Sequence, residues 1–344
     1  MTGSGDPSTR SAISQHQRPI ALEDPQFHCI PCSAVSHRPG GRAHRTREVV
    51  SGSPSWAQSA TIFTVDFVAG REAVADATAR FCDLLGSTPD RTLRVRGSAW
   101  TVAGVAAHVA TVADSYVGYL DGTVAPVVHV HTLNRDNAAN LAAFHGRAVT
   151  ALAARIRDGS EAFLDSTSEL GIDHPMRWHD VPATIGTVYG IYLGELLVHG
   201  RDIARTLGRS WPISRTDAII IFEGMISVGQ WFLVPTRASD GVFEINVRHG
   251  PSYTLRFMGG SLDLEPDRVG RPDCRIWADP RALTLVLYGR LSQWRAVLRG
   301  QLIAGGRRLW RALTFPARFG GFEDSRRTSK HSDWQLRAIT SMGV

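Results

Sequence analysis

The sequence of 344 residues contains almost no lysine: Lys330 is the only one, and arginine carries nearly all of the positive charge. The formal net charge of +6 is modest for this length, and the basic residues are scattered along the chain. Binding of nucleic acid by charge needs basic residues gathered on one face or in one run. We therefore expect no nucleic-acid partner.

Cysteine is scarce as well, with four residues in the whole chain, too few for a disulfide framework. Cys82 and Cys274 lie in apolar stretches and are expected to be buried thiols. His28, Cys29 and Cys32 resemble half of a metal-binding knuckle, but no second Cys or His pair follows at zinc-finger spacing. We assign no metal to them.

Long apolar runs are missing too. No basic segment followed by an apolar core opens the sequence, so no secretory signal is predicted. The most apolar helical stretches are shorter than a membrane span requires, and they contain charged residues such as Glu195 and Glu223. These features predict a cytoplasmic protein with no membrane partner.

What the sequence does contain is enough hydrophobic residues, 43%, for two cores. Residues 1–60, rich in Ser, Gly, Pro, Arg and Gln, predict a disordered N-terminal extension. Helical periodicity predicts a bundle over 61–235, and alternating patterns predict a small α+β domain over 240–320. Residues 321–344 form a polar tail. The expected fold class is two-domain α+β.

The first domain shows helical starts and stops at regular places. Thr101 is expected to cap a helix that runs to about Leu120 and is stopped by Asp121–Gly122, and Asp158–Gly159 is expected to end the next. Pro182 suits the first turn of another helix. The predicted helices cover 67–86, 101–120, 133–157, 182–207 and 215–232. Long helices with modest connections favour a bundle whose interior can hold a metal.

The second domain alternates between strand and helix patterns. Strands are predicted over 243–247, 253–257, 261–264, 274–277 and 301–304, short helices over 280–288 and 294–299, and a closing segment over 307–315. This order is typical of a small α+β domain distinct from the bundle.

Glu195 and His199 are four residues apart on one predicted helix, and His108 lies on another. An i,i+4 pair projects from one helix face, one turn apart. Two imidazoles and one carboxylate supply the three protein ligands of an open zinc-type site, with the fourth position left for water or a substrate thiol. Spacing alone is equally consistent with a surface pair formed by Glu195 and His199, and with a hydrogen-bonded core position for His108.

The motifs around these residues carry a resemblance to a known family. They are Trp100-Thr101-Val102 followed by His108, and Glu195-Leu-Leu-Val-His199-Gly-Arg-Asp202 followed by Leu207-Gly208-Arg209. The chain from Phe67 to Phe319 resembles the mycothiol-dependent maleylpyruvate isomerases, a branch of the DinB-like metal-binding four-helix bundles. Its second part resembles the sterol-carrier-like module often fused to them, through Leu287-Tyr288-Gly289-Arg290, Gly300-Gln301-Leu302 and Gly305-Gly306.

The resemblance implies that His108, Glu195 and His199 bind a divalent cation, most often zinc. It also implies a low-molecular-weight thiol, mycothiol, and a small electrophilic substrate. In the maleylpyruvate reaction the thiolate adds to a conjugated double bond, rotation follows, and elimination gives the trans isomer; related bundles transfer the thiol instead. The expected protein is thus a metal- and thiol-dependent isomerase or transferase.

Asp202, three residues after His199, has two interpretations. It is either an acceptor that orients an imidazole or the partner of an arginine such as Arg201 or Arg205. Arg201 departs from the aromatic or small residue usual in the family, and Gly104 departs from an acidic residue at the third helical position.

Other candidates are less specific. His129 and His131 flank Val130 without a third ligand nearby, and His174 and His179 lie in a loop that could overhang the bundle. Arg248 and Arg256, on predicted strands, could contact an anionic substrate as readily as solvent.

Two further functions are compatible with the sequence. In one, the metal only stabilises the bundle structurally, and the sterol-carrier-like domain binds an apolar ligand. In the other, the chemistry is degenerate and the protein acts through interactions, although the intact triad argues against decay.

Overall fold

The computed structural model describes residues 64, 66–88, 90–123, 133–144, 148–234, 239–265 and 270–320. The predicted N-terminal extension, 1–60, and the predicted tail, 321–344, lie outside these residues. So do Cys29, Cys32, His129 and His131.

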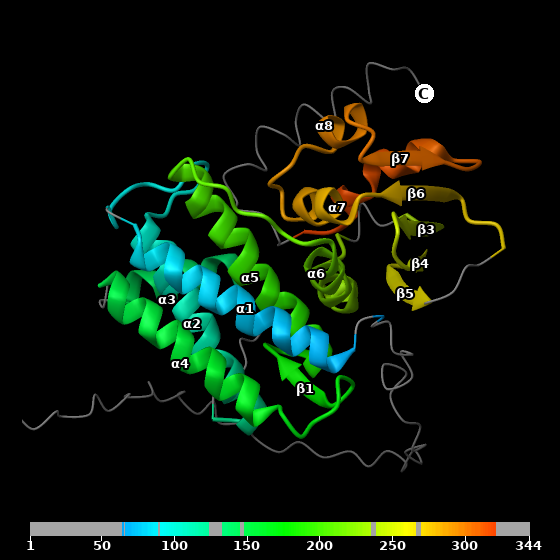
Figure 1. Cartoon of the computed structure of the whole chain (residues 1–344). Coiled ribbons are helices and arrows are strands. Elements are labelled where there is room, and N and C mark those ends of the chain that lie inside the picture. The colour runs from blue at the N-terminus through cyan, green and yellow to red at the C-terminus, as the bar shows by residue number, and fades with distance from the viewer. Residues whose placement is uncertain are drawn as a thin grey trace, which may run out of the picture. The chain divides into compact units, whose positions relative to one another are not determined.

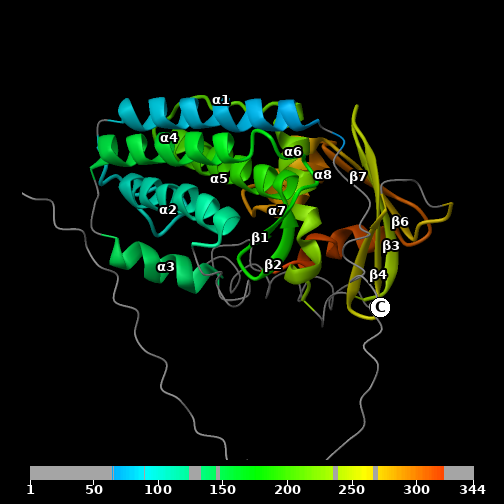
Figure 2. The ribbon, with the colours of Figure 1, turned by 90° about the horizontal axis from the view of Figure 1, so that it is seen from below.

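The first part of the described chain is a helical bundle (Figure 1). Its long helices are α1 (Phe67–Gly86), α2 (Val102–Asp121), α4 (Val149–Ser166) and α5 (Ile185–Thr206), with the shorter α3 (Leu133–Ala143) beside α2. Figure 2 shows α1, α4, α5 and α2 lying side by side. Their apolar faces share one core that includes Phe81, Phe163 and Leu196.

Side-chain caps fix where these helices begin, because the first backbone N–H groups of a helix lack partners within it. Thr101 accepts a hydrogen bond from the N–H of Gly104, which confirms its predicted role. Asp66 and Thr184 cap α1 and α5 in the same way. Gly122, with a φ of 78°, ends α2 in the left-handed conformation that glycine adopts readily.

The third predicted helix, 133–157, is wrong in its bounds. The structure divides it into α3 and α4, and α4 continues through Gly159 to Ser166. A Cβ at position 159 would lie 3.0 Å from the Cβ of Ala113 on α2. The glycine therefore allows two helices to approach each other and does not end one.

The fourth predicted helix starts three residues later than the sequence indicates. Its expected first turn is instead part of a hairpin, in which β1 (Pro175–Trp178) pairs antiparallel with β2 (Val181–Thr184). Helix α5 begins only at Ile185, after the Thr184 cap. The fifth predicted helix also ends early, since α6 spans Arg215–Ser227 and the 3-10 turn η3 follows over Gly229–Phe232.

Helix α6 crosses α5 at a pair of glycines. A Cβ on Gly190 would lie 2.8 Å from the Cα of Gly224, a backbone atom that no side-chain rotation can move away. Both glycines are buried within their helices. The two backbones therefore touch at this crossing, which places α6 between the bundle and the second domain's core.

The second domain is built on a five-stranded sheet with the order β5-β4-β3-β6-β7. The strands are β3 (Gly241–Val247), β4 (Ser252–Met258), β5 (Ser261–Glu265), β6 (Cys274–Ala278) and β7 (Leu302–Gly305). Strands β3 and β6 run parallel, and the other neighbours run antiparallel. These positions confirm the strands predicted from alternation, and Cys82 and Cys274 are free, buried thiols as expected.

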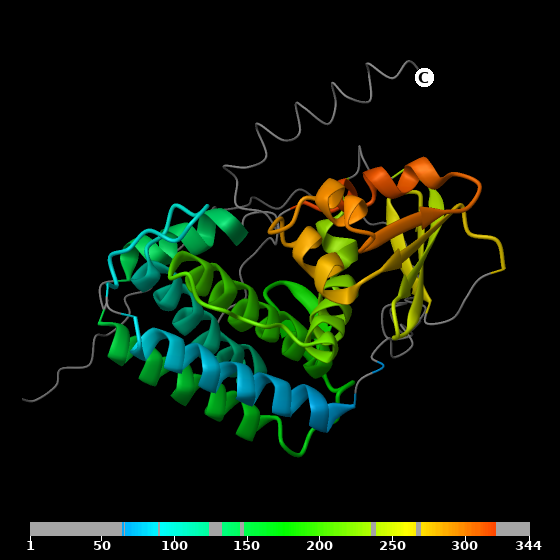
Figure 3. The ribbon, with the colours of Figure 1, turned by 45° about the horizontal axis from the view of Figure 1, so that its top comes forward.

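Helices cover one face of the sheet. They are α7 (Pro280–Leu287) and α8 (Gln293–Leu298), followed by 3-10 segments η4 (Leu309–Thr314) and η5 (Pro316–Arg318). Figure 3 shows the orange helices beside the yellow and orange strands. Phe222 of α6 and Leu283 of α7 pack with Phe243 and Ile245 of β3 in a second core. None of the helices in the described ranges is long and apolar enough to cross a membrane.

Candidate metal centre

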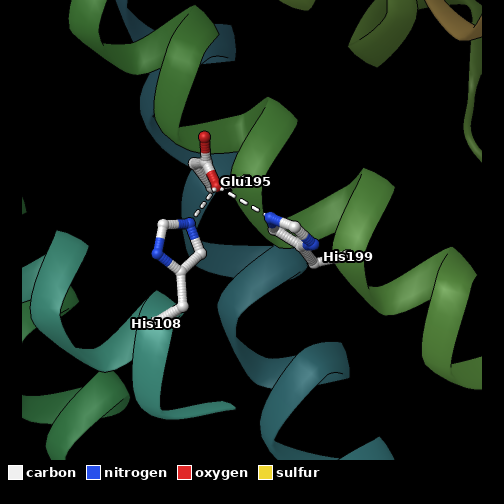
Figure 4. A group of neighbouring side chains, drawn as sticks. All are labelled: His108, Glu195 and His199. Atoms are coloured by element: carbon white, nitrogen blue, oxygen red, sulfur yellow. Dashed lines mark hydrogen bonds and ion pairs between the residues drawn. The ribbon is translucent and has the colours of Figure 1, made fainter. Parts of the chain in front are cut away.

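The three residues singled out by the sequence lie together inside the bundle, His108 on α2 and both Glu195 and His199 on α5 (Figure 4). The Nε2 atoms of the two histidines each lie 3.1 Å from the same atom, Oε2 of Glu195. The candidate ligand atoms of the three residues are all within 4.8 Å of one another. Three donors converging in this way match the protein ligand set of an open divalent-metal site.

The triad is buried to different degrees. His108 is 5% exposed, whereas the side chains of His199 and Glu195 are 16% and 21% exposed. Glu195 and His199 thus face the bundle interior and are not an exposed surface pair.

The electrostatics of the triad favour an ionised carboxylate. Burial alone raises the pKa of Glu195, but the hydrogen bonds and charges of His108 and His199 outweigh it and hold that pKa well below its ordinary range. A carboxylate that is ionised beside two imidazole nitrogens is the form that binds a cation.

Trp100 covers the two imidazoles. Its ring centroid lies 5.1 Å from that of His108 and 6.4 Å from that of His199. Trp100 comes immediately before the Thr101 cap, so the turn that begins α2 also fixes the indole against the site. This arrangement gives a structural reason for the tryptophan-threonine pair in the sequence motif.

Three tyrosines lie close enough to sense the charge of the carboxylate, Tyr116 and Tyr192 buried and Tyr288 partly buried. Burial raises the pKa values of Tyr116, Tyr192 and Tyr288, and the negative charge of Glu195 raises them further. These hydroxyls stay protonated and add no charge to the site. Sequence reasoning missed them, although Tyr192 could have been found because it precedes Glu195 by three residues on one helix face.

Tyr288 reaches the site from the second domain, just after α7. Its ring packs on Gly194, where an added Cβ would lie 3.0 Å from Cζ of the tyrosine and closer still to its hydroxyl. Gly194, next to the candidate ligand Glu195, therefore leaves space for the side chain of Tyr288, which lies nearly a hundred residues further along the chain. No local sequence signal predicts such a contact.

Asp202 is also paired with the second domain. Its Oδ2 accepts a hydrogen bond from Nε of Arg290 at 2.8 Å, and the two side chains are 9% and 19% exposed. An arginine partner was one of the two interpretations of Asp202, but the arginine is neither Arg201 nor Arg205. The sequence could not indicate Arg290, because the pair depends on how α7 and its following turn pack on α5.

The remaining candidates lie elsewhere. Arg248 donates to the carbonyl oxygen of Gly300, and Arg256 pairs with Glu265 within the second domain's sheet. His179 contacts the hydroxyl of Tyr119 at 2.8 Å, while His174 is exposed. None of these four belongs to the cluster formed by the triad.

The fold and site define a class: a helical bundle with a largely buried His-Glu-His cluster, joined to a small α+β domain. Residues 71–204 match the family described as the mycothiol maleylpyruvate isomerase N-terminal domain. This match lies within the bundle, and it confirms the resemblance predicted from the motifs. The family is named for an enzyme, in agreement with the expectation of an enzyme.

Solved structures give weaker similarities. Two of them are crystal structures of the mycothiol-dependent maleylpyruvate isomerase, one of which is a histidine-to-alanine mutant. Each is 11% identical to this chain, and the similarity covers 71% of this chain and 95% of theirs. The TM-score is 0.43 for the mutant and 0.42 for the other structure. The UbiJ-SCP2 ubiquinone synthesis protein is 22% identical over 28% of this chain and 87% of its own, with a TM-score of 0.25. No curated protein matches the sequence. Since every TM-score is below 0.5, the family match and the structure itself carry the assignment.

Proposed function

We propose that this protein is a zinc-dependent enzyme that uses a low-molecular-weight thiol, mycothiol, to isomerise a small electrophilic substrate or to transfer the thiol to it. The observation that carries the proposal is the convergence of the His108 and His199 Nε2 atoms on Glu195 Oε2, each at 3.1 Å. The family match to the bundle supports the same reaction class.

The donor set fits a divalent cation. Two neutral imidazoles and one carboxylate would leave the site with a net charge of about +1. A zinc ion held there acts as a Lewis acid that lowers the pKa of a thiol or water placed in its open position. The proposed ligands are therefore His108, Glu195 and His199.

The chain's own residues prepare the surroundings. Trp100 shields the imidazole rings from solvent and limits how they can turn. Tyr116, Tyr192 and Tyr288 keep their protons, so they can donate hydrogen bonds without adding a second negative charge that would repel a thiolate. Asp202, held by Arg290, fixes the turn of α5 that follows His199.

Elemental analysis combined with turnover tests the proposal. We expect wild-type protein to contain about one zinc ion per chain and to convert maleylpyruvate only when mycothiol is present. His108→Ala and His199→Ala should lose both the metal and the turnover. His174→Ala, which removes an exposed histidine outside the triad, is the matched control and should retain both.

Two outcomes would contradict the proposal. Wild-type protein that stays metal-free after zinc is added would exclude the metal centre. Zinc bound through the triad without thiol-dependent turnover of any electrophile would favour the non-catalytic module instead, and native mass spectrometry with lipids would then test its second domain.

A further inference from the structure

One face of the second domain exposes apolar side chains that a soluble protein normally buries or disperses. This face, here called the edge surface, is formed by α8 and η4, which lie next to the edge strand β7, and α8 is seen beside β7 in Figure 1. Leu298 is 86% exposed, Trp310 59% and Leu309 53%. Val297 and Leu313 are exposed as well.

The two elements of the edge surface, α8 and η4, are connected to each other and to β7. Both α8 and η4 contact β7, and the side-chain amide of Gln293 on α8 donates to the carbonyl oxygen of Leu313 on η4 at 3.1 Å. Helix α8 buries only Ala296 and leaves its remaining apolar residues outward. Scattered exposed leucines need no explanation, but apolar residues gathered on one face mark an interaction site.

The segment that forms this surface carries charged residues of one sign. Between Pro280 and Gly320 the sequence contains eight arginines and no aspartate or glutamate. Arg290, Arg308 and Arg311 pair with carboxylates that lie earlier in the chain. Arg295, Arg299 and Arg307 are exposed and form no ion pair within the described part of the chain.

A surface with exposed tryptophan and leucine side chains and arginines beside them suits one kind of partner best. Nucleic acid offers phosphates to the arginines but little to aliphatic side chains such as Leu298 and Leu309. A lipid bilayer with acidic headgroups satisfies both, because apolar side chains enter the headgroup boundary while the arginines contact the headgroups. Tryptophan is itself enriched at that boundary.

We propose that the edge surface docks this protein on the surface of an anionic lipid bilayer. The docking is peripheral and does not involve a spanning helix. It is independent of the proposed reaction, and it departs from the sequence-based expectation that the protein has no membrane partner.

Vesicle sedimentation with the full-length protein tests the proposal. We expect binding to vesicles of phosphatidylcholine mixed equally with phosphatidylglycerol, at least about tenfold weaker binding to phosphatidylcholine alone, and weaker binding as salt is raised. Leu298→Glu and the double change Arg295→Glu with Arg299→Glu should each lower the binding about tenfold or more. All of these side chains are exposed, so the fold should persist.

Val68→Glu is the matched control. Val68 is 59% exposed on α1 of the bundle, and its replacement should leave vesicle binding unchanged. The proposal is overturned if the wild-type protein does not bind the anionic vesicles, or if Leu298→Glu binds them as wild type does. Concentration-dependent dimerisation abolished by Leu298→Glu, without vesicle binding, would assign the surface to a second copy. Binding of duplex DNA in place of vesicles would also overturn it.

Discussion

Glu223 lies wholly buried on α6, where a charged carboxylate is costly. Its Oε1 accepts hydrogen bonds from the Tyr253 hydroxyl at 2.5 Å and from the N–H and hydroxyl of Thr64 at 3.0 and 2.6 Å. Its Oε2 has no hydrogen-bond partner among the described residues. Burial raises the pKa of Glu223, and these hydrogen bonds offset the rise only in part.

This raised pKa gives stability a predictable dependence on pH. The folded pKa of Glu223 lies above the unfolded value of about 4.3, so its favourable contribution is complete below that pH and is lost as pH rises through the folded pKa. Glu223→Gln should therefore stabilise the protein by about 1–2 kcal/mol near about pH 8, with a smaller gain near about pH 4. Denaturant unfolding over a pH series measures the difference, and a gain independent of pH would contradict it.

The sequence predicted those residues of the candidate centre that a short sequence motif marks, and it did not predict the others. His108, Glu195 and His199 stand out because an i,i+4 pair and a tryptophan-threonine helix start are visible in the sequence. Tyr288 and Arg290 lie in a sequence motif of the second domain, and nothing in that motif indicates a contact with the bundle. Their contacts with Gly194 and Asp202 depend on domain packing, which no spacing rule encodes.

At the scale of elements, the crossing of α5 and α6 tolerates little change, because backbone meets backbone there. Gly190→Ala would place a Cβ 2.8 Å from the Cα of Gly224, so the helices must separate, and we expect a loss of about 3 kcal/mol in unfolding free energy. Gly86→Ala is the control, because nothing lies within 4 Å of an added Cβ there. It should be neutral or stabilising by about 0.5–1 kcal/mol. Equal effects of the two changes in thermal unfolding would refute this account.

The same kind of contact explains why some predicted helix bounds were wrong. Gly159 reads as a stop signal, but its role is to let α4 approach Ala113 on α2. Residues 181–184 continue the apolar pattern of α5, but they pair with β1 and are strand. Tertiary packing determines the structure in both cases. Where a side-chain cap close in sequence sets the start of a helix, as Thr101 does for α2, the predicted start is correct.

On the scale of the whole molecule, the Asp202–Arg290 pair joins the two domains in a mostly buried position. Removing one partner leaves the other charge buried alone, so Arg290→Met and Asp202→Asn should each cost about 3 kcal/mol. The double variant should lose much less than the sum, because neither charge remains. Arg256→Met, which breaks the more exposed pair with Glu265, should cost less than about 1 kcal/mol. Additive losses in chemical unfolding would show that the pair does not couple the domains.

Gly194 has a consequence for the ancestry of the chain. Because Gly194 has no side chain, Tyr288 can pack against α5 there, so this bundle fits a neighbour that a solitary bundle would not possess. A bundle evolving alone would have no reason to keep this position empty, and alanine there would strengthen its helix. The residue at this position should therefore distinguish bundles that have long evolved with an attached domain of this kind from those that acquired one recently or lack it.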